Sequence, residues 1–168
     1  MDNTIIRKGT VADAARVAEI YNHYVRTSPV IFSNTELTAD EMAAKIERLR
    51  LGDPFPFSVA VDEASGQVAG YCSAHLWQPD AVYSRSWEIT IYLAADTGGR
   101  GIGTALLGRM ISECRELGAH TLVSFVTRGN TPCERLHTSA GFRLVGVVEQ
   151  SGFKFGKYYD DAIYQLIL

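Results

Sequence analysis

Glu88 is an acidic side chain in a run of residues that otherwise alternates between apolar and polar. Residues 87–93 read WEITIYL, and this period of two predicts a strand with one buried face. Glu88 then lies on the face opposite the apolar residues. A carboxylate in partly apolar surroundings has a raised pKa, which suits a general base. The simpler alternative is an exposed glutamate on a strand.

A glycine-rich loop follows this strand. Residues 98–103 read GGRGIG, and from Ile102 onward apolar residues recur at helical spacing as far as Leu117, with Gly118 at the cap position. Backbone N–H groups at such a helix start, together with the positive end of the helix dipole, form a site for a phosphate or pyrophosphate. The P-loop pattern GxxxxGK[ST] and the dinucleotide pattern GxGxxG are both absent from the chain. An ordinary glycine turn between a strand and a helix is the alternative.

Three further candidates surround a short helix predicted after Asn130. Asn130 precedes Thr-Pro, an arrangement typical of a helix N-cap, and its side chain is also free to bind a ligand. His137 could donate a proton, or it could simply pack near the end of the helix. Cys133 lies one turn before His137, and a Cys/His pair would permit an acyl-cysteine intermediate. No cluster of His, Cys and carboxylate residues has metal-ligand spacing, so we expect no metal.

The composition sets limits on the class of protein. The chain has 168 residues, 46% of them apolar and 21% charged, which predicts one globular domain over residues 1–168. A net charge of −3 argues against a nucleic-acid-binding surface. Three widely spaced cysteines are interpreted as reduced thiols of a cytoplasmic protein. With no leader-like start and no long apolar run, we expect no membrane association.

The elements that must position these residues follow in a mixed order. Capping boxes at Thr10-x-x-Asp13 and Thr38-x-x-Glu41 predict helices that end near residues 26 and 50, the second one closed by residues 52–54. Strands are predicted at residues 4–7, 57–61, 67–76, 87–93, 121–127, 142–149 and 159–167. The order is β-α-α-β-β-β-α-β-α-β-β. It predicts an α/β (α+β) mixed sheet of six or seven strands with helices on both faces, in which the strands near Ile91 and Val123 are parallel neighbours.

Some residues with chemically useful side chains are assigned to the core instead. Helical spacing places four of them on buried faces: Tyr21, Tyr24, Met110 and Cys114.

This element order and the loop at residues 98–103 resemble the GNAT superfamily of N-acetyltransferases. Four separated segments resemble its phosphinothricin acetyltransferase group. They are IYNHYV at residues 20–25, Glu88 followed by IYL at 91–93, Asn130 with LH at 136–137 and GF at 141–142, and GFKFGK at 152–157.

The chain departs from the group mainly where a substrate would bind. The leading Gln or Arg of the family loop is Gly98, and the family serine is Cys133. The segment between the third and fourth strands lacks the Arg that suits a substrate carboxylate or phosphinate. Arg85 follows a little later, after Tyr83.

The resemblance implies a GNAT fold and an enzyme that uses acetyl-CoA as co-substrate to acetylate a small amino-acid-like amine, of the phosphinothricin or methionine sulfoximine type. Direct attack by the amine is implied, with Glu88 as base and His137 as the candidate proton donor. The expected cofactor-binding residues are Ile91, Tyr92, Leu93, Gly99, Arg100, Gly101, Ile102, Gly103, Thr104, Asn130 and Cys133. The expected substrate-binding residues are Phe32, Tyr83 and Arg85.

The resemblance also suggests a homodimer. Two alternatives stay open: a non-catalytic acyl-CoA sensor of the same fold, and an acetyltransferase of a peptide or protein amine.

Overall fold

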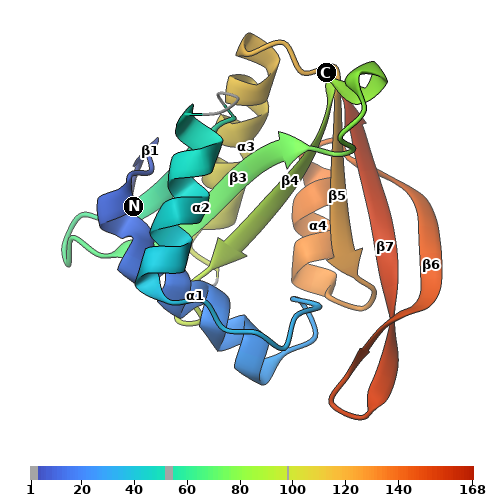
Figure 1. Ribbon diagram of the computed structural model, residues 1–168, viewed down its shortest axis with the longest axis horizontal. Coiled ribbons are helices and arrows are strands. Elements are labelled where there is room, and N and C mark those ends of the chain that lie inside the picture. The colour runs from blue at the N-terminus through green and yellow to red at the C-terminus, as the bar shows by residue number, and fades with distance from the viewer. Residues whose placement is uncertain (1–3, 52–54, 98) are drawn as a thin grey trace.

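A computed structural model describes residues 4–51, 55–97 and 99–168 of the chain (Figure 1). The predicted helix stop at residues 52–54 and the departure at Gly98 lie outside these residues. The element order agrees with the predicted one. The strands are β1 (Thr4–Lys8), β2 (Phe57–Asp62), β3 (Val68–Leu76), β4 (Ser86–Leu93), β5 (Thr121–Thr127), β6 (Arg143–Lys154) and β7 (Lys157–Ile167). The α-helices are α1 (Ala14–Thr27), α2 (Ala39–Leu51), α3 (Ile102–Glu116) and α4 (Thr131–Ser139). Short 3-10 turns lie at Val11–Asp13 and Ala81–Tyr83.

The strands form one seven-stranded sheet in the order β1-β2-β3-β4-β5-β7-β6. Every neighbouring pair is antiparallel except β4 and β5, which are parallel because α3 connects them across one face. The predicted mixed sheet is therefore confirmed, with its parallel pair at the predicted strands.

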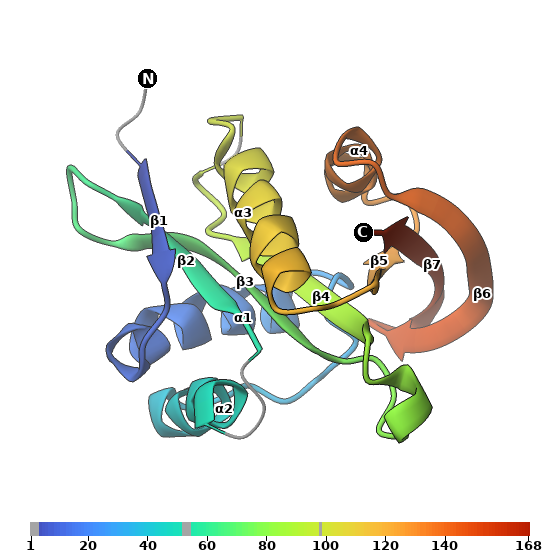
Figure 2. The same cartoon turned by 90° about the horizontal axis from the view of Figure 1, so that it is seen from above.

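Helices cover both faces of the sheet. Figure 2 shows α1 and α2 on one side and α3 and α4 on the other. Each face has its own apolar core: Val17, Ile20, Met42 and Ile46 pack from α1 and α2, and Leu106, Leu107, Met110 and Cys114 pack from α3. This division follows from sequence, since each helix carries one apolar face. No helix in the described ranges is long and apolar enough to cross a lipid bilayer.

The capping boxes form as predicted. The backbone N–H of Thr10 donates to Asp13 Oδ2 at 2.8 Å, and the backbone N–H of Thr38 donates to Glu41 Oε2 at 2.8 Å. Because these contacts satisfy N–H groups at the start of each segment, they fix where the chain enters α1 and α2.

The feature of the sheet that matters most for a site is the separation of β4 from β5. The two strands pair only at Ser86 with Thr121, Trp87 with Leu122 and Glu88 with Val123. Beyond Glu88 the two strands diverge, as Figure 1 shows. The sheet is thus open between the C-terminal halves of its two parallel strands.

Candidate functional site

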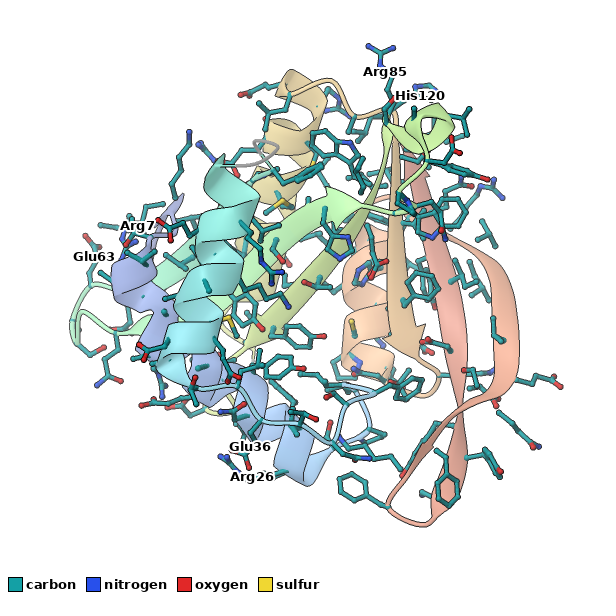
Figure 3. The ribbon with its side chains drawn as sticks, viewed as in Figure 1. Arg7, Arg26, Glu36, Glu63, Arg85 and His120 are labelled. Carbon is teal, nitrogen blue, oxygen red and sulfur yellow. The ribbon has the colours of Figure 1, made fainter. Side chains whose placement is uncertain are left out.

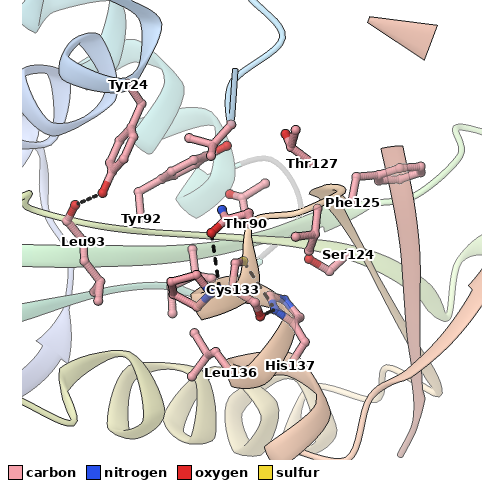
Figure 4. A pocket seen from close by; sticks show the side chains of 15 residues that line it. Tyr24, Thr90, Tyr92, Leu93, Ser124, Phe125, Thr127, Cys133, Leu136 and His137 are labelled. Atoms are coloured by element: carbon pink, nitrogen blue, oxygen red, sulfur yellow. Dashed lines mark hydrogen bonds between the residues drawn. The ribbon is translucent and has the colours of Figure 1, made fainter. Parts of the chain in front are cut away.

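A cavity of about 190 Å³ lies in this opening (Figure 4). Its walls come from the C-terminal halves of β4 and β5, from the start of α4, and from Tyr24 and Val30. Ile91 and Leu93, which the sequence places on the apolar face of the strand, are half-buried and line this cavity. Tyr92, Asn130, Cys133 and His137 also line it. The fold therefore brings six of the predicted site residues together.

The edge of β4 that faces the cavity carries main-chain hydrogen-bonding groups. On the other edge, Ala94 N–H donates to Ala69 O at 2.8 Å, and the β3–β4 register is regular throughout. Since alternate residues of an antiparallel strand bond to the same neighbour, the main-chain groups of Ile91 and Leu93 point the other way, toward β5. An extended ligand that contains amide groups could pair with this edge as an added strand.

The glycine-rich loop ends at the start of α3. Gly101 is the N-cap with φ of 75°, and Gly99 has φ of 78°, a left-handed conformation that glycine adopts without strain. The first N–H groups of α3 have no partner within the helix, so they can bind an anion. A methyl group on Gly103 would come within 3.3 Å of Leu136 and 3.4 Å of Leu93, so a larger residue would require these side chains to shift slightly.

The side chain of Arg100 forms an ion pair at the end of β2. Its guanidinium donates to Asp62 Oδ2 at 2.9 Å, at the turn that joins β2 and β3. This contact is the main reason why the pKa of Asp62 falls to about 2. Arg100 therefore fastens the loop to the β2–β3 turn.

Asn130 caps α4 as its sequence context predicts. Its Oδ1 accepts from the backbone N–H of Cys133 at 3.4 Å, and Pro132 follows in the first turn. The thiol of Cys133 has a pKa raised to about 11, chiefly by burial. Such a thiol stays protonated near neutral pH, which disfavours an acyl-cysteine route.

His137 is completely buried, against the rings of Phe142 and Tyr164. Its Nδ1 lies 2.8 Å from the carbonyl oxygen of Cys133, and because a carbonyl only accepts, Nδ1 carries the proton. Nε2 is buried with no hydrogen-bonding partner among the described residues, and burial lowers the pKa of the ring. A neutral ring whose only N–H is already engaged is poorly arranged for the predicted role of proton donor.

Glu88 lies at the point where β4 and β5 separate. It does not itself line the larger cavity, but Thr90 and Tyr92, on the same face of β4, do. The Glu88 side chain is 23% exposed, and desolvation by burial raises its pKa. Asp161 raises the pKa further, whereas His75 and Lys45 lower it, His75 more than Lys45. A partly buried carboxylate with a raised pKa can accept a proton from an amine.

His75 faces Glu88 across the β3–β4 pair. Its Nε2 lies 3.9 Å from Glu88 Oε1, and its Nδ1 lies 2.9 Å from the carbonyl oxygen of Leu76. Nδ1 must donate to that carbonyl, so Nε2 is the nitrogen that faces Glu88. The sequence pattern did not single out His75, because the cross-strand register that pairs it with Glu88 is a tertiary feature.

Tyr21 and Tyr24 were assigned to the core, and the structure corrects this. Both are only half-buried. The Tyr24 hydroxyl donates to the carbonyl oxygen of Leu93 at 2.7 Å in the wall of the larger cavity (Figure 4). Tyr21 lines a second cavity of about 50 Å³ under α2. Helical spacing placed both on the inner face of α1, but each borders a cavity, which leaves part of that face unfilled.

The predicted substrate residues lie apart from the cavity. Figure 3 shows Arg85 pointing outward at the end of the sheet, next to His120. Tyr83 is 37% exposed and packs edge-on against Trp77. Phe32 is 40% exposed, with its ring centroid 6.4 Å from that of Tyr159. Within the described ranges, none of these three residues lines the cavity.

The site combines a helix start with free N–H groups, a strand edge that could pair with an extended amide-bearing arm, and a partly buried carboxylate at the inner end of the opening. Within the described ranges no three His, Cys, Asp or Glu side chains are grouped so that they could hold a metal ion. These parts suit transfer of an acyl group from a long pyrophosphate-bearing carrier to an amine.

Two curated relatives span nearly the whole chain. It is 32% identical to the phosphinothricin N-acetyltransferase of Streptomyces coelicolor over 95% of this chain and 94% of the relative. It is 35% identical to the L-methionine sulfoximine/L-methionine sulfone acetyltransferase of Salmonella typhimurium over 97% of this chain and 94% of the relative.

Solved structures agree with these relatives. A phosphinothricin acetyltransferase from Sinorhizobium meliloti, solved with acetyl-CoA, matches with a TM-score of 0.93 and 31% identity over 100% of this chain and 89% of that chain. A ribosomal-protein-alanine N-acetyltransferase from Brucella melitensis matches with a TM-score of 0.93 and 35% identity over 98% and 99% of the two chains. The acetyltransferase (GNAT) family model matches residues 17–142. The chain therefore belongs to the GNAT family of acetyltransferases.

Proposed function

We propose that this protein transfers an acetyl group from acetyl-CoA to the amine of a small amino-acid-like substrate. The observation that carries the proposal is the opening between β4 and β5, with an anion-binding helix start near one end and a carboxylate of raised pKa near the other. Two relatives support this substrate class, because one is named for phosphinothricin and the other for methionine sulfoximine and methionine sulfone.

The residues present fit acetyl-CoA. The starting N–H groups of α3 and the loop at Gly99 and Gly101 would hold its pyrophosphate. The main chain of Ile91 and Leu93 would pair with the pantetheine arm, and Asn130 and Cys133 line the wall beside it. When bound, acetyl-CoA supplies the thioester.

The chain's own contribution to the chemistry is a proton acceptor and a fixed geometry. Glu88 takes the proton that an ammonium substrate must lose before it can attack, directly or through a water. The main-chain N–H groups of β4 that point toward the opening would donate to the oxygen of the reacting carbonyl. His75 lies beside Glu88 and is 42% exposed, so this side of the carboxylate borders solvent.

A second candidate is acetylation of a protein α-amine, favoured by the similarity to the ribosomal-protein-alanine N-acetyltransferase. A non-catalytic acyl-CoA sensor is the third. The homodimer and the cytoplasmic location expected from the sequence stay predictions.

Release of free thiol from acetyl-CoA tests these candidates. The amine panel consists of phosphinothricin, L-methionine sulfone, L-methionine sulfoximine and a peptide that begins with alanine. Turnover with a small amino acid and none with the peptide supports the proposal. Turnover with the peptide alone favours the second candidate, and acetyl-CoA binding without turnover on any amine favours the sensor.

A further inference from the structure

Lys45 lies on the side of α2 that faces the sheet. It lines the 50 Å³ cavity together with Tyr21, Ser73, Thr90 and others. The residue as a whole is exposed, but its ammonium lies 5.8 Å from the centroid of the Tyr21 ring, and the surrounding protein lowers its pKa. The charged end of Lys45 is therefore held beneath α2.

Lys45 is the only Lys or Arg among the described residues that line the 190 Å³ cavity or the small cavity under α2. Other cations nearby are engaged elsewhere. Arg100 binds Asp62, Arg26 binds Glu36, and Lys154 donates to the carbonyl oxygens of Ser28 and Ile31. A negatively charged group in the small cavity would therefore meet a single Lys or Arg side chain among the described lining residues, that of Lys45.

The two cavities adjoin, because Thr90 and Tyr92 line both. Ser73 Oγ lies 2.9 Å from Thr90 Oγ1, so one hydroxyl of this pair donates to the other and the second keeps a proton for another acceptor. A cavity of about 10–15 Å³ can hold one water molecule. The 50 Å³ of this cavity is therefore enough for a carboxylate group. The small cavity thus offers room, an ammonium and a hydroxyl donor to an anion.

We propose that Lys45 binds the carboxylate of an α-amino acid substrate while Glu88 faces its amine. This inference rests on the proposed function and makes it more specific. An α-amino acid carries opposite charges on neighbouring atoms, and Glu88 and Lys45 present the complementary charges from β4 and α2. Lys45 would then take the place of the Arg that the segment before β4 lacks, since Arg85 points away from the site.

The inference is tested by comparing L-methionine sulfone with its α-amide, which keeps the amine and loses the negative charge. We expect the wild type to prefer the free acid in kcat/KM. Lys45→Met should reduce that preference roughly 10- to 100-fold, the loss expected for a hydrogen bond between charged groups. Because the amine pKa of each substrate is the same in both proteins, it cancels from this ratio. Lys45→Arg should keep most of the preference.

Arg48→Gln is the matched control. It removes a positive charge from the same helix, three residues from Lys45, at an exposed side chain that does not line the cavity. If Arg48→Gln loses as much of the preference for the free acid as Lys45→Met does, the effect comes from the overall positive charge of α2, and the inference is overturned. So would a wild type without preference for the free acid, or a Lys45→Met variant that keeps it, overturn it.

Calorimetry with coenzyme A present measures binding of L-methionine sulfone without turnover. Binding that Lys45→Met weakens by the same factor supports the carboxylate site even if no acetyl transfer occurs, in which case only the proposed reaction fails. If the wild type does not bind the amino acid, or Lys45→Met binds it equally well, the carboxylate site is wrong.

Discussion

Replacing Gly101 with Glu should abolish the stabilisation of this protein by acetyl-CoA. Gly101 is the N-cap of α3, and a methyl group built on it would meet no atom within 4 Å. A side chain there would therefore extend into open space at the helix start, where the pyrophosphate is proposed to lie. A carboxylate in that position would compete with the phosphates for the same N–H groups.

The expected sizes of the two effects can be separated. A non-glycine residue at the φ of 75° costs about 1–2 kcal/mol, which lowers the Tm of a protein of this length by roughly 2–8 °C. Acetyl-CoA at about 100 times its Kd stabilises the wild type by about 2.7 kcal/mol, which raises the Tm by roughly 5–11 °C. Thermal unfolding with and without acetyl-CoA should show the rise in the wild type and none in Gly101→Glu.

Gly118→Glu is the matched control, at the opposite end of the same helix. Gly118 also has a positive φ, 92°, and a methyl group on it would also meet no atom within 4 Å. This variant should show a similar loss of Tm and a full acetyl-CoA shift. An unchanged shift in Gly101→Glu would show that the cofactor does not use this loop.

Three further predictions concern single side chains. His75→Gln removes a positive charge that lowers the pKa of Glu88, so the acidic limb of kcat/KM should move to higher pH, whereas His120→Gln at the exposed end of the sheet should leave it in place. If the acidic limb of kcat/KM does not move in His75→Gln, His75 does not influence the pKa of the group that acts as the base. Cys133→Ser should keep kcat within about threefold and show no acyl-enzyme by mass spectrometry, because a thiol with a pKa of about 11 is not the nucleophile. Lys154→Met leaves two loop carbonyl oxygens without their ammonium donor and should cost about 2–4 kcal/mol in urea unfolding. Wild-type stability would mean that these bonds contribute little.

The sequence could predict the elements whose signals are local. Alternation placed β4, helical spacing placed α3, and Thr10 and Thr38 marked the helix starts. The end of β6 was missed. The strand continues to Lys154, past the predicted residue 149, because much of it is exposed and its pairing is irregular between Val148 and Gly152, so apolar alternation fades.

The sequence pattern could not predict features that depend on how distant segments pack together. The insertion of β7 between β5 and β6 depends on which strand covers the edge of β5, and adjacent sequence does not specify that. Helical spacing alone could not show that Lys45 lines a cavity between α2 and the sheet, nor could it pair His75 with Glu88. The general base, the glycine loop and Asn130 could be proposed from sequence because the resemblance to a family marked their positions. The substrate side could not, because there the chain departs from that family.

The central claim is that Glu88 accepts the proton of the attacking amine, and Glu88→Gln tests it most directly. Gln keeps the shape of the side chain and cannot take the proton. Because burial raises the pKa of Glu88, the folded protein holds the ionised carboxylate less well than the unfolded chain does, so Glu88→Gln should not lower the Tm at neutral pH. The cofactor contacts lie elsewhere, so the Kd for acetyl-CoA should also stay unchanged.

The decisive measurement is the pH profile of acetyl transfer by the wild type and Glu88→Gln, with the same amine. The account predicts that kcat falls roughly 10²- to 10⁴-fold near neutral pH and that the two enzymes converge at high pH, where the amine loses its proton in solution. An intact kcat with a raised KM would make Glu88 an anchor for the substrate ammonium. Full activity of Glu88→Gln at neutral pH would contradict the account.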